Sequence, residues 1–245
     1  MKITSKRPAK TPLSRSLGWQ RGVLQASPIV MGYVPVGFAY GVLAQKAGIS
    51  PLNTVLMSLI VYAGASQFIA VGLFADQLPA VTIILTTFVV NLRHLILSSA
   101  LAPYLQRWRK SELAAFAYHL TDETFAIHST QFSIEVPPKP AVFALNITAQ
   151  CSWVCGSMLG VFAGKLIPDV RPFGLDYALT ALFIALLVLQ IKHRFHVIVA
   201  LLTGILAVGL LQLGLNRWNV IVATVIGATI GVTLEQWINT PSSSS

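Results

Sequence analysis

Long apolar blocks dominate this sequence and restrict the folds open to it. About 20 apolar residues in a helix span the hydrocarbon core of a bilayer, whereas membrane strands are shorter and alternate in polarity. Only 10% of the residues are charged, too few to cover a water-soluble globule, in which about 25% are charged. The sequence therefore predicts an all-α polytopic membrane protein with six to eight membrane segments, at residues 24–45, 52–75, 80–103, 113–133, 141–164, 173–191, 196–214 and 217–238.

These blocks divide the chain into three parts. Residues 1–22 contain six of the 17 basic residues and lack the apolar core of a signal peptide, so we expect a basic cytoplasmic tail. Residues 23–238 form one predicted transmembrane transport domain, and residues 239–245, ending in four serines, a predicted disordered tail. The other basic residues lie mostly between blocks, a placement typical of membrane orientation and not of nucleic-acid binding.

Two blocks differ in composition from a regular membrane helix. The block at 24–45 contains two prolines and three glycines, which weaken a helix. The block at 113–133 contains His119, Asp122, Glu123 and His128 and is too polar for lipid contact. Such segments survive at membrane depth only when protein buries them or when they line a wet cavity. We therefore expect both blocks to be broken or re-entrant helices.

The positions of the basic residues test this prediction. If all eight blocks cross the membrane, nine basic residues lie inside and seven outside, with Arg93 within the membrane. If the two unusual blocks return to the side they enter, the division becomes 13 inside and three outside. Positive residues collect on the cytoplasmic side, so the sequence favours six crossings, a cytoplasmic loop at 104–112 and two cytoplasmic termini.

The candidates for chemistry are the ionisable groups inside the blocks. Arg93 lies near the middle of its block, with Asn91 and His94 beside it. An arginine at that depth costs about 2.5–3.5 kcal/mol unless it has a partner, and Asp122 and Glu123 are the available carboxylates. The pair is either a structural tie or part of a substrate and proton site. The carboxylate left over would exchange protons, and His94 is either a participant or an ordinary core histidine.

A solute site is expected near the bilayer midplane, between the blocks at 24–45 and 113–133, because transporters bind at discontinuous helices. Half-helix N-termini would attract a carboxylate. Gln67 needs hydrogen-bond partners at mid-membrane, although the small residues before it also fit simple helix packing. The predicted substrate-binding residues are Pro35, Phe38, Tyr62, Ser66, Gln67, Asn91, Arg93, Asp122, Glu123 and Trp153, and those for proton coupling are His94, Asp122 and Glu123.

Enzymatic signatures are weak. Ser66 and His94 could form a hydrolase dyad, but the rhomboid-type pattern has glycine after the serine and this chain has Gln67. P-loop, HExxH and GxGxxG patterns are missing. Cys151 and Cys155 have no partners for a disulfide or metal set, so they are expected to be ordinary buried thiols. We therefore expect no catalytic residue, no metal and no cofactor.

Five short motifs follow one another in the first two thirds of the chain. They are Pro28-Ile29 with Pro35 and Phe38-Ala39-Tyr40-Gly41; YAGASQF at 62–68; Leu92-Arg93-His94; Leu120-Thr121-Asp122-Glu123 with Phe125-Ala126; and Ser152-Trp153-Val154. In this order, over residues 22–165, the chain resembles the AzlC-type large subunit of branched-chain amino-acid exporters. Residues 170–238 give weaker support.

The resemblance implies a secondary transporter of the bacterial inner membrane that works with a small AzlD-type membrane subunit. It implies export of valine, leucine, isoleucine and sometimes methionine, and we expect coupling to protons. The expected partners are therefore the lipid bilayer, the small subunit and an amino acid, with no nucleic acid. Two alternatives remain open: a channel-like or ion-coupled permease for another small solute, and a membrane scaffold that transports nothing.

Overall fold

The computed structural model describes residues 12–169, 171–174, 177–191, 193–214 and 219–239. The outer parts of both predicted tails, 1–11 and 240–245, lie outside the described residues. All regular elements described are helical, and four helices are long and apolar enough to cross a membrane. The predicted all-α membrane fold is therefore confirmed. The chain divides into two compact units, Met1–Leu182 and Phe183–Ser245.

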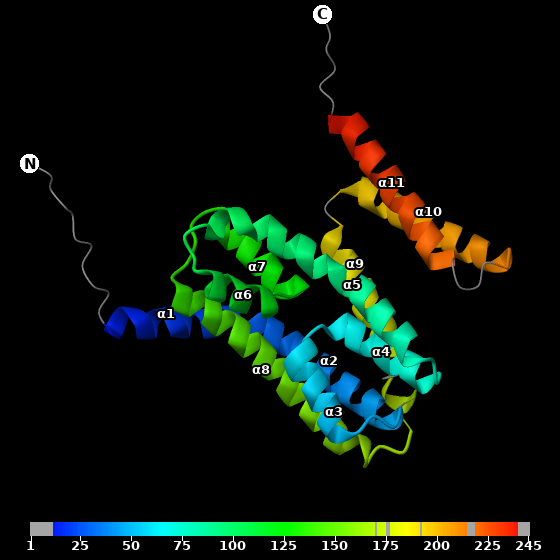
Figure 1. Ribbon diagram of the computed structural model, residues 1–245, viewed down its shortest axis with the longest axis horizontal. Helices are drawn as coiled ribbons and strands as arrows, with labels where there is room; N and C mark the ends of the chain where they lie inside the picture. Colours follow the sequence, from blue (N-terminus) through cyan, green and yellow to red (C-terminus); the bar gives the residue numbers. More distant parts are fainter. Residues whose placement is uncertain (1–11, 170, 175–176, 192, 215–218, 240–245) are drawn as a thin grey trace, which may run out of the picture. The chain divides into compact units, whose positions relative to one another are not determined.

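The first unit holds most of the helices (Figure 1). They are α1 (Pro12–Gln25), α2 (Ser27–Lys46), α3 (Pro51–Leu56), α4 (Gly64–Ala75), α5 (Ala80–Leu101), α6 (Lys110–Tyr118), α7 (Asp122–Phe132) and α8 (Lys139–Gly164). A π-helical turn, η1 (Met57–Val61), extends α3, and the 3-10 turn η2 (Ala102–Leu105) extends α5. The short turn η3 (Arg171–Phe173) and helix α9 (Ala178–Gln190) follow α8.

The broken helices are not the pair that composition predicted. The block at 113–133 is interrupted between α6 and α7, as expected, but α2 continues without a break through Pro35. The predicted break in the first block is therefore wrong, because one proline removes a single hydrogen bond and α8 supports the helix along its length. The second broken block is instead 52–75, where Tyr62 adopts a left-handed conformation with φ 43° and separates η1 from α4.

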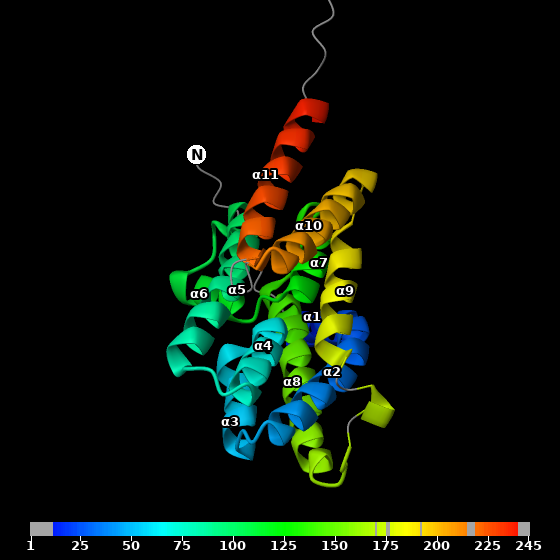
Figure 2. The same cartoon turned by 90° about the vertical axis from the view of Figure 1, so that its right-hand side faces the viewer.

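Helices α2 and α8 lie side by side and run in the same direction (Figures 1 and 2). Glycines make this close approach possible. A Cβ atom added to Gly41 would collide with the carbonyl oxygen of Ser157, and one added to Gly160 with that of Phe38. Two of the three glycines that suggested a flexible first block, Gly37 and Gly41, therefore form its packing face against α8.

This packing face gives a direct test. Gly160→Ala is expected to destabilise the protein by about 1–3 kcal/mol, because the added methyl group meets rigid backbone. Gly32→Ala is the matched control, since Gly32 lies in α2 with no atom within 4 Å of the added Cβ. That change is expected to be neutral or to stabilise by about 0.5–1 kcal/mol. Thermal unfolding of the detergent-purified variants measures both, and equal effects would contradict the packing role of Gly160.

Each broken block folds back on itself as a helical hairpin. In the first hairpin, residues 51–75, Gln67 of α4 donates a hydrogen bond of 3.1 Å to Ser58 of η1. In the second hairpin, residues 110–132, the Phe116 ring of α6 contacts the rings of His128 and Phe132 in α7. The tips are residues 62–63 and 119–121, respectively.

The two hairpins enter the first unit from opposite ends. The second begins beside the start of α8, where Lys139 pairs with Glu112 at 2.5 Å. The Lys139 hydrogen bond, together with one from the Arg109 backbone, lowers the pKa of the Glu112 carboxyl. At the other end, Asn53 and Phe74, from the two arms of the first hairpin, line one groove with Gly48. The tips therefore approach each other near the middle of α8.

Helix α5 runs antiparallel to α8 and connects the two ends (Figure 1). Its last residue, Leu101, packs in a buried cluster with Val142 near the start of α8 and with Phe116 of the second hairpin. A second cluster surrounds Trp153 and Tyr40, between α2, α8 and the first hairpin. Each hairpin therefore has an apolar core of its own.

The opposite face of α8 is exposed. Cys151 and Cys155 are free thiols on this face, so the prediction that they are buried is wrong. The buried face of α8 is taken by residues such as Trp153 and Gly160, which lie on the other side of the helix. An exposed cysteine costs little in a membrane because its thiol is only weakly polar.

The second unit contains α10 (Arg194–Gln212) and α11 (Asn219–Asn239). They pack together through a glycine, because a Cβ atom added to Gly227 would collide with Thr203. The Thr203 hydroxyl donates a hydrogen bond of 2.7 Å to the Val199 carbonyl, so this hydroxyl has its partner within α10. Helix α10 is one of the four candidate spans.

Candidate functional site

The tips of the two hairpins bring the N-termini of α4 and α7 into the interior of the first unit. Thr121 caps α7: its hydroxyl accepts a hydrogen bond from the Thr124 amide, and the Thr124 hydroxyl accepts one from the Thr121 amide. This exchange is a capping box and fixes the first turn of α7. Ala63 precedes α4 and offers no side-chain cap.

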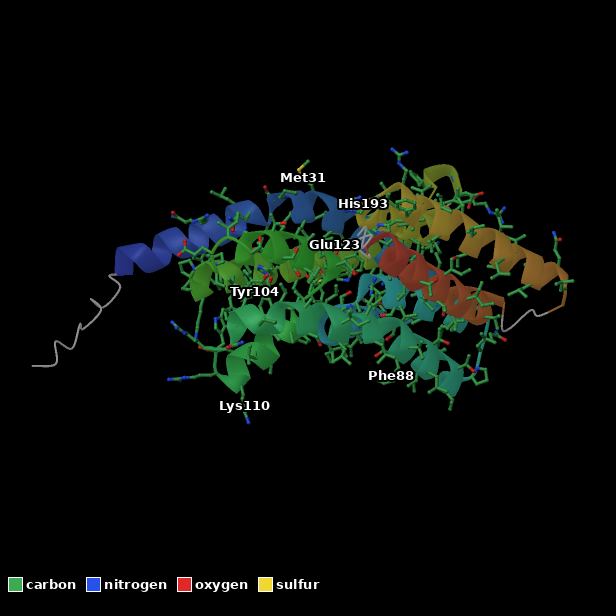
Figure 3. The ribbon with its side chains drawn as sticks, turned by 90° about the horizontal axis from the view of Figure 1, so that it is seen from above. Met31, Phe88, Tyr104, Lys110, Glu123 and His193 are labelled. Carbon is green, nitrogen blue, oxygen red and sulfur yellow. The ribbon has the colours of Figure 1, made fainter. Side chains whose placement is uncertain are left out.

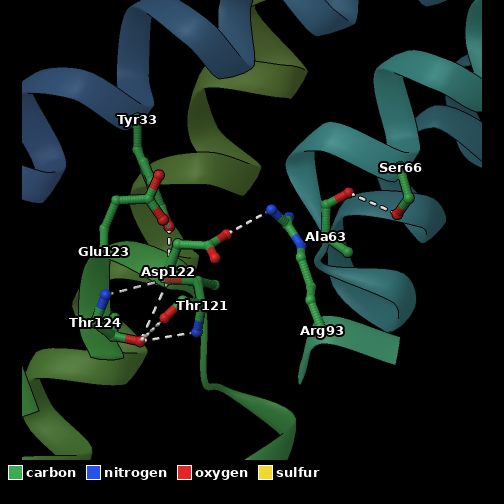
Figure 4. A network of polar contacts seen from close by, with 8 residues as sticks. All are labelled: Tyr33, Ala63, Ser66, Arg93, Thr121, Asp122, Glu123 and Thr124. Carbon is green, nitrogen blue, oxygen red and sulfur yellow. Dashed lines mark hydrogen bonds and ion pairs between the residues drawn. The ribbon is translucent and has the colours of Figure 1, made fainter. Parts of the chain in front are cut away.

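Arg93 of α5 is paired with Asp122, the first residue of α7 (Figure 4). Its Nη1 lies 2.8 Å from Asp122 Oδ2, and the side chains are 27% and 21% exposed. Of the two carboxylates expected as partners of Arg93, Asp122 is therefore the one that pairs with it. Figure 4 shows the guanidinium between this carboxylate and Ala63 at the tip of the first hairpin. The ion pair thus joins α5 to the second hairpin next to the first.

Glu123 is not part of this ion pair. Its Oε2 accepts a hydrogen bond of 2.6 Å from the Tyr33 hydroxyl of α2, which also lies 2.7 Å from the Thr121 hydroxyl. The Tyr33 ring packs edge-on against Trp153 at 5.4 Å. Tyr62, also buried, interacts electrostatically with Glu123. Glu123 therefore accepts from one neutral donor, Tyr33, beside a carboxylate that is already neutralised by Arg93.

Gln67 holds the first hairpin to α8. Its side chain is fully buried, donates to Ser58 and accepts from the Trp153 indole at 3.1 Å. The Ser66 hydroxyl donates a hydrogen bond of 2.9 Å to the Ala63 carbonyl at the tip. The Trp153 ring rests against Gly64, where an added Cβ would lie 2.9 Å from it. Contact of these side chains with a solute stays a prediction.

Four predicted residues lie outside this network. Pro35 is exposed on α2, and Phe38 is partly buried, with its backbone against α8. Asn91 and His94 are half-buried on α5, and Asn91 Oδ1 and His94 Nε2 have no hydrogen-bond partner among the described residues. Their roles in binding and proton coupling also stay predictions. No cluster of three or more metal-ligating side chains occurs in the described part of the chain.

Sequence reasoning missed Tyr33 and Thr121. Thr121 carries a local signal, because a threonine directly before Asp-Glu and three residues before another hydroxyl is typical of a helix N-cap. Tyr33 has no comparable local signal. It is an aromatic residue with a hydroxyl group in an apolar block, and a buried tyrosine hydroxyl usually has a hydrogen-bond partner.

Comparison with known proteins places this arrangement in a family. The sequence model of the AzlC protein matches residues 28–167, which include α2 from its second residue on, both hairpins, α5 and α8. The chain belongs to the AzlC family. The family match therefore contains every residue of the polar network just described, from Tyr33 to Trp153.

Relatives of this AzlC-family chain occur in bacteria and archaea. An uncharacterized membrane protein of Archaeoglobus fulgidus is 36% identical, over 88% of this chain and 94% of the relative. The inner membrane protein YgaZ of Escherichia coli is 31% identical, over 91% and 92%. The branched-chain amino acid transport protein AzlC of Bacillus subtilis is 26% identical, over 78% and 75%. No solved structure matches the chain.

These relationships establish the general class of function. The chain is a membrane protein of a family associated with transport, and one relative is named for the transport of branched-chain amino acids.

Proposed function

We propose that this chain is the large subunit of a proton-coupled secondary transporter that exports valine, leucine, isoleucine or methionine across the bacterial inner membrane. The convergence of two broken helices on the Arg93–Asp122 pair, with Glu123 left beside it, carries the proposal. Transporters place their solutes at such interruptions. The name of the Bacillus subtilis relative supports the class of solute.

The N-terminus of α4 is the better site for the solute carboxylate. The first turn of α7 already contains Asp122 and Glu123, which offset its positive end. The first turn of α4 contains no acidic residue and no side-chain cap, and Arg93 lies next to it (Figure 4). A carboxylate there would accept hydrogen bonds from the free backbone N–H groups and would face the guanidinium of Arg93.

Glu123 is the group that would hold the solute ammonium and exchange a proton. Asp122 is engaged by Arg93, so Glu123 is the carboxylate whose charge is free to change. The Trp153 ring packs against Tyr33, which donates to Glu123, and Tyr62 is buried within electrostatic reach of Glu123. These two buried rings would contact a branched apolar side chain. Release of the proton as the ammonium arrives would make solute and proton compete, as an antiporter requires.

The proposed orientation in the membrane treats both hairpins as re-entrant. With α2, α5, α8 and the three apolar segments after α8 as crossings, 12 basic residues lie inside and four outside. This is almost the division expected from the sequence, although the first hairpin has replaced α2 as the re-entrant segment. Both termini and residues 104–112 are then cytoplasmic.

A cysteine introduced at Ser111 tests this orientation. Ser111 is exposed at the start of α6, next to Lys110, which points away from the helices (Figure 3). In intact cells the Ser111→Cys variant is expected to resist a membrane-impermeant thiol reagent and to react once the cells are opened. The native cysteines are replaced by alanine both in this variant and in the control protein, which keeps Ser111. Labelling of intact cells would place the loop outside and exclude this orientation.

Efflux of radiolabelled valine tests the function itself. Cells that express the chain together with a small AzlD-type subunit are expected to export valine faster than cells with either protein alone. Export of a different solute only would support the alternative of another small-solute permease. Absence of any flux from a complex that assembles correctly would favour the membrane scaffold.

A further inference from the structure

A second polar cluster lies where the two hairpin tips meet α8. The Tyr118 hydroxyl, at the end of α6, donates a hydrogen bond to the Leu59 carbonyl in η1. Gln150 of α8 donates one to the same carbonyl at 3.1 Å and another to the Tyr118 hydroxyl at 3.0 Å. These three groups link the two hairpins by hydrogen bonds, and neither the Arg93–Asp122 pair nor Glu123 takes part in this cluster.

The Leu59 carbonyl needs these donors because of how the first hairpin turns. In a continuous helix it would accept from an amide four or five residues later, but the left-handed Tyr62 redirects the chain at that point. Among the described residues no backbone amide reaches this carbonyl. Tyr118 and Gln150 therefore supply both of its hydrogen bonds.

The cluster is exposed at mid-membrane depth. Gln150 lies close to the centre of α8, which runs from Lys139 to Gly164, and Tyr118 is 43% exposed. No donor among the described residues reaches Gln150 Oε1. Polar groups at this depth cannot face hydrocarbon, so they line water or are covered by protein.

The donors are also redundant. If the Tyr118 hydroxyl leaves, Gln150 still donates to the Leu59 carbonyl, so the hairpin tips can separate without leaving this carbonyl unpaired. We propose that Tyr118, Gln150 and the Leu59 carbonyl form a gate on a water-filled solute path: the Tyr118 hydrogen bond closes it, and Gln150 stabilises the tip of the first hairpin when it opens. The gate rests on the proposed transport function but not on the identity of the solute.

The native Cys151, beside Gln150 on the exposed face of α8, reports on this gate. With Cys155 replaced by alanine, Cys151 in membranes is expected to react with a cationic, membrane-impermeant methanethiosulfonate. The matched control is Phe88→Cys in a background without native cysteines, because Phe88 is 62% exposed at the middle of α5 among apolar residues. It is expected to stay unreactive, and equal protection of Cys151 would overturn the water-filled path.

Tyr118→Phe tests the closing step. The variant keeps the ring but loses the hydroxyl. The rate of Cys151 modification is expected to rise about fivefold, because the loss of one net hydrogen bond shifts the equilibrium between closed and open gate by about that factor. Gln150→Leu keeps the Tyr118 bond to Leu59 and is expected to cause no such rise. Equal rates in the two variants would overturn the gate, and Tyr118→Met allows the same comparison if Tyr118→Phe does not accumulate. Labelling needs no valine, so an absence of valine flux with Cys151 still reactive would reject only the proposed solute.

Discussion

Replacement of Glu123 by glutamine is expected to leave a folded protein whose valine efflux no longer responds to a pH gradient. The amide keeps the size of the side chain, and its oxygen can still accept from the Tyr33 hydroxyl that now lies 2.6 Å from Glu123 Oε2. The Arg93–Asp122 pair is untouched. Only the ability to bind and release a proton is removed, and with it the proposed coupling.

Reconstituted vesicles with an imposed gradient measure this loss. One pH unit corresponds to about 1.4 kcal/mol, so one-for-one exchange in the native protein would sustain about a tenfold valine ratio. The variant is expected to show equal valine on both sides, reached by slow exchange. Tyr33→Phe is the matched control, because it removes the hydrogen bond to Glu123 but keeps the carboxylate and should weaken coupling only in part. An unchanged gradient response of Glu123→Gln would exclude Glu123 as the coupling group.

The fold could be predicted from sequence where the signal is local. The interruption between α6 and α7 was evident because four ionisable residues, His119, Asp122, Glu123 and His128, make this block too polar for lipid contact. The first hairpin gave no such signal, since its turn is made by Tyr62 in a left-handed conformation and by small residues that also fit regular packing. In α2 the glycines suggested a break, but Gly41 instead provides space for the backbone of α8. Composition alone does not distinguish glycine for flexibility from glycine for close contact.

The candidate site was predictable to the extent that charge requires a partner. The cost of an unpaired arginine in the membrane was enough to place Arg93 beside Asp122 or Glu123, and the structure selects Asp122. Tyr33 and Gln150 were missed because their polar partners lie 90 and 91 residues away, respectively. Such contacts follow from how the hairpins pack, and no spacing within one segment encodes them.

The contrast between the two neighbouring carboxylates is sharpest in Asp122→Asn. This change leaves Arg93 within the membrane without its partner, at a cost of about 2.5–3.5 kcal/mol. The expected result is a lower level of protein in the membrane and a fall of about 5–10 °C in the unfolding temperature of the purified protein. Asp76→Asn is the control: Asp76 is exposed at the end of α4, without an ion pair among the described residues, and its loss should change stability by less than about 0.5 kcal/mol.

The double variant Arg93→Gln with Asp122→Asn separates the structural role of the pair from its role in binding. Removing both charges eliminates the uncompensated arginine, and two amides at the 2.8 Å position of the ion pair can hydrogen-bond to each other. Its stability is therefore expected to exceed that of Asp122→Asn alone, which a double-mutant cycle measures as a coupling free energy. Valine efflux is nevertheless expected to stay lost, because the guanidinium proposed to face the solute carboxylate is gone. Recovery of efflux along with stability would show that Arg93 and Asp122 only tie α5 to the second hairpin.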